Sequence, residues 1–253
     1  MLSPRTLAIL VALSSIAQGY FHSESSALEC LDIESLNGLE TEQLSWLGRI
    51  RYTRSSGGVW YPCSGVAITP HHVLAPAHCV MFQEKRDIFS FLVDKKLHAV
   101  SQVFIHPEYR LESSTHDVAV LKLNHSLSSC LALSEVEGFE SLIGQRLDVV
   151  SSAEKHPKNV HAQAKVTGQS YCQRKFKDFK ISENEVCAHL LHRNNEFLNG
   201  AALLGVKWLS GTESWRLLGI STHGPYERNN QVPDLYTLVA PYAKWIKNIT
   251  KMY

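Results

Sequence analysis

Two segments of the chain carry side chains suited to nucleophilic hydrolysis, and a third lacks the group that would attack. His78 lies in one segment, and Asp117 opens an apolar run in another. A histidine held by a buried aspartate can take the proton from a serine hydroxyl. A later glycine-containing segment should supply that serine, yet it has Asn199 before Gly200. The sequence therefore predicts the frame of a hydrolase without its nucleophile.

Other uses of the polar side chains have to be weighed. Ser221 and Thr222 could act as displaced nucleophiles, although strand hydroxyls usually have no chemical role. A metal site is another use, with the candidate ligands His71, His72, His78 and Asp117. Adjacent residues of an extended segment point to opposite faces, so His71 and His72 are poor joint ligands. We expect no metal and no cofactor.

Short strands must position these groups. Apolar and polar residues alternate in many short segments with turn signals between them, which predicts an all-β sandwich or barrel. The expected strands are 46–52, 59–68, 88–93, 99–105, 118–123, 146–150, 162–166, 202–208, 215–220 and 235–239. Only the end is helical, because Tyr242, Trp245, Ile246 and Ile249 recur at helical spacing after Pro241.

The 253 residues fall into three expected parts. Residues 1–19 have the features of a secretory signal peptide, with Arg5 before an apolar core. Residues 20–43 form an acidic lead-in without lysine or arginine, and residues 44–253 form the β domain. No later apolar run is long enough to span a bilayer. Acidic and basic residues nearly balance, so composition favours neither nucleic acid nor membrane as a partner. We expect a secreted, extracellular protein.

Covalent modifications are also expected in an oxidising compartment. Six cysteines in a secreted chain favour three disulfides, although spacing alone does not choose the pairing. Asn124 and Asn248 each begin an Asn-X-Ser/Thr triplet, so both are candidate glycosylation sites.

Taken together, the segments resemble the chymotrypsin/trypsin family of serine proteases. Residues 63–79 resemble its histidine segment and residues 116–123 its aspartate segment. Residues 219–224 resemble its substrate-binding strand, and residues 233–246 its last strand and closing helix. The matches keep the family's order from about residue 44 to residue 253. The resemblance implies two six-stranded antiparallel β-barrels, a C-terminal α-helix and a cleft between the barrels.

The resemblance also implies a cysteine pairing. The implied pairs are Cys63–Cys79, Cys172–Cys187 and Cys30–Cys130. The first pair would pin His78 at the barrel edge, and the last would tether the lead-in to the body of the domain. A similar tether occurs in arthropod clip-domain proteases and their inactive homologues. A clip domain would require more cysteines upstream of Cys30, so we expect none here.

The nucleophile loop departs from the family at three consecutive positions. Its Gly-Ala-Ala-Leu end lines up with the family's Gly-Gly-Pro-Leu, which puts Asn199 in the place of the serine. Leu198 replaces an aspartate that pairs with a newly cut N-terminus in active relatives. Phe197 replaces a glycine that donates an oxyanion N–H. His78 cannot activate an amide as it activates a hydroxyl, because the nitrogen lone pair is delocalised. The resemblance therefore implies an inactive homologue.

Two other regions agree with this expectation. Active relatives are cut after lysine or arginine, and residues 30–46 contain neither. Arg193 falls about where trypsin-like relatives have an acidic pocket base, so a basic substrate would meet like charge. His223 stands where a tryptophan usually walls the cleft. Thr222 and Gly224 complete the expected cleft.

The resemblance implies a function in binding. The expected partners are extracellular proteins, such as a protease or a protease substrate. Arthropod homologues with this defect act as cofactors or regulators of immune protease cascades, including melanisation. The alternative is an active serine-type endopeptidase with a rearranged nucleophile. The basic run at 165–180, with Arg174, Lys175 and Lys177, could bind a glycosaminoglycan, although such runs are more often solvated loops.

Overall fold

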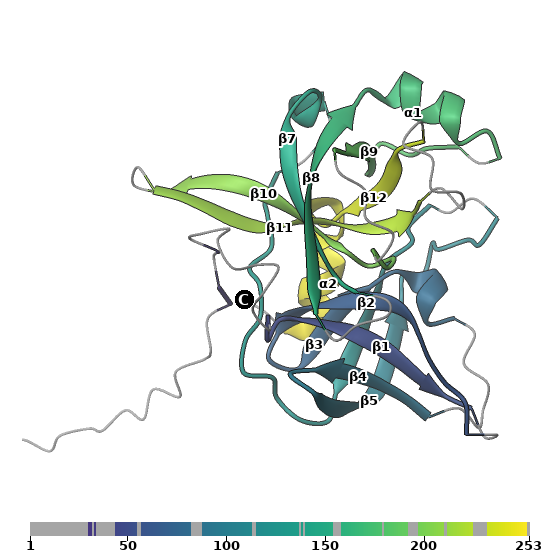
Figure 1. The fold of residues 1–253 in the computed structure, drawn as a ribbon, viewed down its shortest axis with the longest axis vertical. Coiled ribbons are helices and arrows are strands. Elements are labelled where there is room, and N and C mark those ends of the chain that lie inside the picture. The colour runs from purple at the N-terminus through teal and green to yellow at the C-terminus, as the bar shows by residue number, and fades with distance from the viewer. Residues whose placement is uncertain are drawn as a thin grey trace, which may run out of the picture.

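The computed structural model describes residues 30–31, 33, 44–54, 57–81, 88–112, 115–136, 138, 140–153, 158–178, 180–191, 197–209, 212–224 and 232–251, and every structural statement below concerns these residues. The expected signal at 1–19 and most of the lead-in at 20–43 lie outside them. The described chain forms two closed antiparallel β-barrels of six strands each (Figure 1), which confirms the fold that the resemblance implied.

The first barrel is built from the amino-terminal half of the described chain. Its strands lie in the order β1-β2-β3-β6-β5-β4, and β1 pairs with both β2 and β4, which closes the sheet. Side chains such as Ile50 and Phe91 point inward and are fully buried. The strands are β1 (Leu47–Thr53), β2 (Val59–Thr69), β3 (His72–Ala75), β4 (Ile88–Val93), β5 (Lys96–Ile105) and β6 (Ala119–Leu123).

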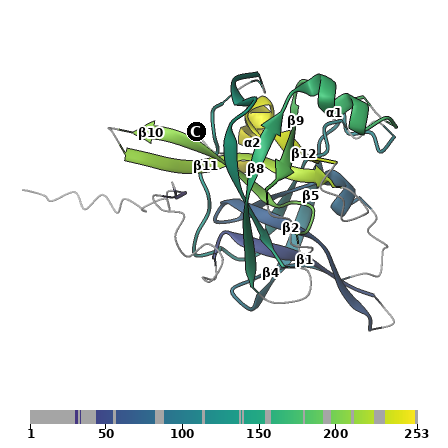
Figure 2. The same ribbon diagram turned by 45° about the horizontal axis from the view of Figure 1, so that its top comes forward.

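The second barrel repeats the connectivity of the first. Its order is β10-β11-β12-β9-β8-β7, which, read from β7 back to β10, is the order of the first barrel with each strand number raised by six. The hairpin of β10 and β11 extends well beyond the barrel in both views (Figures 1 and 2). The strands are β7 (Arg146–Ser152), β8 (Asn159–Thr167), β9 (Glu185–Leu190), β10 (Ala202–Leu209), β11 (Thr212–His223) and β12 (Asp234–Leu238).

Two strands and one α-helix of the described chain were not expected from the sequence pattern. Strands β3 and β9 are buried along almost their whole length, so they show no apolar–polar alternation. Helix α1 (Gln169–Lys175) begins after Gly168, within the basic run that the sequence favours as a loop. Arg174 and Lys175 both approach the ring of Tyr171, so part of the charge in this run covers an aromatic face.

The end of the chain joins the two barrels. A 3₁₀ turn, η3 (Ala240–Tyr242), follows β12 and leads into helix α2 (Ala243–Thr250). Tyr242 therefore precedes the α-helix rather than opening its apolar stripe. Tyr242 and Ile246 are buried in one cluster with first-barrel side chains such as Leu74. The helix thus carries apolar side chains from the last strand of the second barrel onto the first.

The described part of the lead-in is fixed at several points. Cys30 is bonded to Cys130, and the Leu31 N–H donates to the Cys130 carbonyl at 2.7 Å. Ile33 exchanges two backbone hydrogen bonds with Trp215 on β11, at 2.9 and 2.8 Å. This segment therefore contacts both the connection between the barrels and the long hairpin. Among the described residues, the helices are too short or too polar to cross a bilayer.

Candidate functional site

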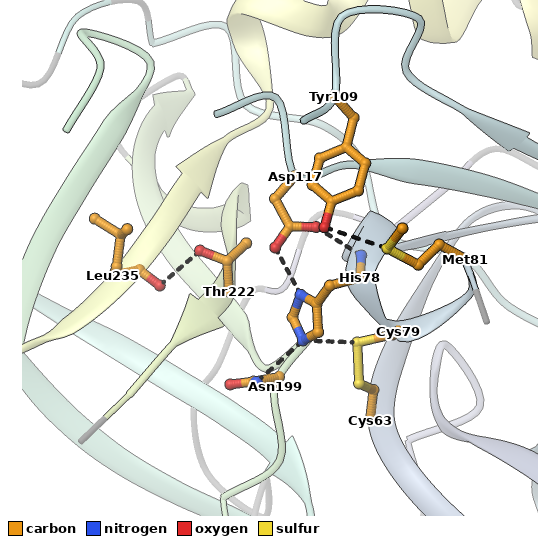
Figure 3. A network of polar contacts seen from close by, with 9 residues as sticks. All are labelled: Cys63, His78, Cys79, Met81, Tyr109, Asp117, Asn199, Thr222 and Leu235. Carbon is orange, nitrogen blue, oxygen red and sulfur yellow. Dashed lines mark hydrogen bonds and ion pairs between the residues drawn. A yellow bond between two sulfur atoms is a disulfide. The ribbon is translucent and has the colours of Figure 1, made fainter. Parts of the chain in front are cut away.

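A histidine–aspartate pair lies at the edge of the first barrel (Figure 3). The turn η1 (Ala77–Cys79) follows β3 and carries His78, and Asp117 lies just before β6. The Nδ1 atom of His78 is 2.6 Å from Oδ2 of Asp117, and the His78 backbone N–H donates to Oδ1 at 2.9 Å. The Asp117 side chain is fully buried. Two hydrogen bonds thus fix the histidine against the carboxylate.

Local covalent and backbone geometry holds this pair in place. The Cys63–Cys79 disulfide joins η1 to β2, and the Tyr52 hydroxyl donates to the Cys79 carbonyl at 2.9 Å. On the other side, His116 has a φ of 57°, and the Val118 N–H donates to its carbonyl at 2.7 Å. This tight turn directs the Asp117 side chain inward.

The side-chain amide of Asn199 lies at the free end of the pair. Its Nδ2 atom is 3.2 Å from Nε2 of His78. An amide nitrogen can only donate, so Nε2 accepts with its lone pair and Nδ1 carries the proton that bonds Asp117. The arrangement Asp117–His78–Asn199 therefore keeps the tautomer that a general base needs, while an amide occupies its basic nitrogen.

Backbone contacts clamp the loop that carries Asn199. The Ser64 N–H donates to the Asn199 carbonyl at 2.7 Å, and the Gly200 N–H donates to the Ser221 carbonyl at 2.6 Å. Gly200 has a φ of +84°, and a Cβ there would overlap the carbonyl oxygen of Ser64. Glycine is thus required by both conformation and space. The loop is held between β2 and β11.

The two residues before Asn199 are also anchored. Leu198 is buried, and its N–H donates to Oγ of Ser151 at 3.1 Å. Phe197 is half-buried and forms an isolated bridge with Ala153. An apolar side chain therefore fills the position where the resemblance implies an aspartate in active relatives.

A pocket of about 320 Å³ opens beside this loop. Its wall includes Leu198, Asn199 and Asp234. A Cβ on Gly224 would come within 2.5 Å of an Asp234 carboxylate oxygen, so the missing side chain leaves room for that group. Asp234 was not among the site residues expected from the sequence, although its place in the segment that resembles the family's last strand was a usable signal. Arg193, the pocket charge that was expected, lies outside the described residues.

The hydroxyls considered as displaced nucleophiles bond to backbone groups. Oγ of Ser221 accepts from the Ala201 N–H at 3.0 Å, and both Ser221 and Thr222 are buried. The Thr222 hydroxyl donates to the Leu235 carbonyl at 3.3 Å. The ring of His223 lies 5.6 Å from that of His78. The pKa of His223 is lowered by burial, although Asp117 acts in the opposite direction.

The histidines weighed as metal ligands are separated. His72 is buried, and its Nδ1 lies 2.8 Å from the Thr69 hydroxyl. His71 is exposed, and His78 is engaged with Asp117. The structure therefore does not gather His71 and His72 around the histidine–aspartate pair.

The remaining candidate positions are the cysteines, the glycosylation sites and the basic run. The disulfides are Cys30–Cys130, Cys63–Cys79 and Cys172–Cys187, the pairs implied by the resemblance. Asn124 and Asn248 are both exposed, as a glycan would require. In the basic run, Lys177 is exposed after the end of α1.

The chain is similar to proteases in both sequence and fold. The sequence model of the family described as Trypsin matches residues 37–246. Two curated relatives are CLIP domain-containing serine proteases B9 and B4 of Anopheles gambiae, each 23% identical. The alignments cover 84% and 82% of this chain but only 61% and 67% of those relatives. Among solved structures, mouse neuropsin, a serine protease expressed in the limbic system of the brain, matches with a TM-score of 0.66 and 20% identity, covering 88% of this chain and all of that one.

Proposed function

Since the chain belongs to the trypsin family, we propose that it is a non-catalytic member that acts by binding other extracellular proteins. In this role it is a cofactor or regulator of a protease cascade outside the cell. The partner is a protease or a protease substrate. An innate-immune cascade of the melanisation type is the proposed setting.

One observation carries the proposal. The atom nearest to the basic nitrogen of His78 at the expected nucleophile position is the amide nitrogen of Asn199, at 3.2 Å. Acyl transfer needs a hydroxyl there that can lose its proton and form an ester. The Asn199 amide can neither give up a proton to His78 nor form an ester. The pair of His78 and Asp117 therefore has no nucleophile to activate at this position.

The surroundings of the loop favour binding over a rearranged enzyme. The buried hydroxyls of Ser221 and Thr222 bond to backbone groups. The pocket beside Asn199 remains open and contains a carboxylate from Asp234. A partner segment could therefore enter the cleft without being cut. The similarity to clip-domain proteases supports the cascade setting.

The test is covalent labelling with a serine-directed fluorophosphonate probe. The purified full chain is incubated with the probe beside trypsin, together with a His78→Ala variant. We expect trypsin to label and the wild-type chain to remain unlabelled, because the Asn199 amide lies against Nε2 of His78 where a hydroxyl is needed.

The opposite result would support the rearranged endopeptidase. Labelling of the wild type that disappears in His78→Ala would show an active nucleophile, and peptide mapping would identify it as Ser221, Thr222 or another residue. Labelling that persists in His78→Ala would show that the probe reacts with a group that does not depend on His78. Such labelling would not indicate activity of the site.

A further inference from the structure

A second cluster of coordinating side chains lies behind the histidine–aspartate pair. His106 follows β5, Glu108 lies just beyond it, and His116 immediately precedes Asp117. One potential ligand atom from each of the three side chains lies within 4.8 Å of the others. The cluster is outside the cleft and outside the function proposed above.

The donors are close to the spacing that one metal ion needs. Nε2 of His116 is 3.9 Å from Oε2 of Glu108. A tetrahedral zinc ion bound at roughly 2.0–2.2 Å to each donor separates them by about 3.4 Å. The Glu108 side chain is 69% exposed, so it can rotate by the small distance required without disturbing the core.

Contacts hold the two rings, and one ring must turn before both can bind the same ion. The rings of His106 and His116 stack at 4.9 Å between centroids, with an interplanar angle of 9°, so their in-plane lone pairs run nearly parallel. Rotation of one ring about its χ2 angle would let both lone pairs meet one ion. Nδ1 of His116 lies 3.2 Å from the Tyr242 hydroxyl, which leaves Nε2 directed toward Glu108. A metal-bound histidine commonly uses its other ring nitrogen in such a hydrogen bond.

One ring nitrogen of the cluster makes only a weak contact that a metal could replace. A ring nitrogen of an imidazole binds a metal through its lone pair. The Glu108 N–H contacts Nδ1 of His106 at 3.3 Å, which is long for a hydrogen bond, so exchanging it for a metal contact costs little.

We propose that His106, Glu108 and His116 form a binding site for a divalent transition metal, with zinc as the best match. Two imidazoles and a carboxylate are a ligand set that zinc accepts, and they leave a fourth coordination position. Because Glu108 is exposed, that position is accessible to water or to a side chain of a bound partner.

The ion would stabilise a structural junction. His106 makes edge contacts with Tyr242 and Trp245, with centroids at 5.1 and 5.0 Å. Tyr242 and Trp245 belong to η3 and α2, whereas the ligands flank β5 and β6. A metal bound here would join His106 to His116, the two ends of the connection between β5 and β6 that leads into Asp117, and it would lie close to η3 and α2.

The experiment is a zinc titration of the chelator-treated full chain by calorimetry, repeated with Co²⁺ as a spectroscopic probe. We expect a binding step of one ion per chain, a higher melting temperature with zinc, and the strong visible absorption of tetrahedral Co²⁺. Stabilisation by zinc follows because the folded chain holds the three donors together.

Two variants and a matched control assign the site. Glu108→Gln removes the exposed carboxylate ligand. His116→Asn removes one imidazole ligand, and asparagine tolerates the positive φ of this position. Each should weaken the one-ion step at least about tenfold. Glu112→Gln changes another exposed glutamate nearby and should bind as the wild type does.

The outcomes against the proposal are equally specific. A wild-type chain without a one-ion zinc step would overturn it. So would unchanged binding in both Glu108→Gln and His116→Asn, because the ion would then use other histidines. Equal loss in the Glu112→Gln control would point to general electrostatics and would also overturn the assignment.

Discussion

At the scale of single residues, Asn199 and His78 decide what the cleft can do. Nδ1 of His78 is bonded to Asp117 at 2.6 Å, which is the alignment a general base requires. Its Nε2 atom meets an amide in place of a hydroxyl. The base is therefore aligned as a general base would be but faces an amide, which makes the Asn199 side chain the sharpest target for substitution.

Replacing Asn199 by serine should restore slow labelling by a fluorophosphonate. The new hydroxyl would lie near Nε2 of His78, while Phe197 and Leu198 would still replace the family's loop residues. Loss of one oxyanion donor typically slows acylation by about 10²–10³-fold, so labelling should be at least that much slower than in trypsin. The measurement is the rate of labelling followed on a gel.

The matched control is the double variant Asn199→Ser with His78→Ala. It should show no labelling, because the hydroxyl then has no base. Complete inertness of Asn199→Ser would contradict the prediction and would mean that Phe197 and Leu198 also block the oxyanion site.

The buried carboxyl group of Glu185 should make the free energy of unfolding depend on pH. The side chain is almost fully buried, and burial raises its pKa from 4.5 to about 7 despite the Ser182 N–H that donates to it at 2.7 Å. Folding thus favours the protonated acid. Its favourable contribution is complete below pH 4.5 and is lost as pH rises through about 7.

Unfolding in urea at pH 5 and pH 8 tests this dependence. The wild type should lose roughly 3 kcal/mol from this group between the protonated and ionised limits. Glu185→Gln cannot ionise but can still accept from Ser182, so its stability should change less between the two pH values. An identical pH dependence in both proteins would contradict the assignment to Glu185.

At the scale of elements, the loop at 197–200 is held by its neighbours more than by its own sequence. Backbone bonds from Ser64 and Ser221 clamp it between the two barrels, and Ser151 anchors Leu198. Because Gly200 has positive φ and no space for a Cβ, the position of Asn199 depends on that glycine.

Gly200→Ala should therefore be strongly destabilising. The added methyl group meets the Ser64 carbonyl, and the φ of +84° is unfavourable for alanine. We expect a loss of more than about 2 kcal/mol in the free energy of unfolding, measured by chemical denaturation. Gly58→Ala is the control, because nothing lies within 4 Å of its added Cβ, and it should change stability by no more than about 0.5 kcal/mol. Similar losses in both variants would argue against a special clamp.

At the scale of the whole molecule, the C-terminal helix makes the two barrels dependent on each other. Val239 and Ile246 belong to the same buried cluster as first-barrel side chains such as Leu74 and Val120. The second barrel also contributes Ala202 to that cluster. The cleft between the barrels is thus supported by an apolar core that both share.

Ile246→Ala should destabilise the whole domain. The side chain is fully buried, so its truncation leaves a cavity and should cost about 2–5 kcal/mol. Because the cluster includes both barrels, we expect one urea transition, shifted to lower concentration and detected alike by fluorescence and circular dichroism. Lys247→Ala, at an exposed position of the same helix, should shift it little. Two separate transitions in the wild type would contradict this coupling.

The sequence by itself determined the family, most of the strands and the chemical identity of the three residues that meet in the cleft. These properties follow from residue types and local periodicity, which the chain carries without being folded. Ten of the strands could be predicted because each is a short apolar or alternating segment between turn signals. The expectation of inactivity likewise rests on residue identity at Asn199, Leu198 and Phe197, and it stays a prediction until labelling is measured.

Only the tertiary structure decided which distant groups share a site. Strands β3 and β9, which the sequence pattern did not single out, are identified by their pairing with β6 and β8 in the barrels. Asp234 enters the pocket because β11 and β12 pair, and Gly224 leaves room for its carboxylate. His106 and His116 stack because β5 and β6 pair and return the chain to the same end of the barrel. Such contacts arise from barrel closure, and sequence spacing along one strand does not contain them.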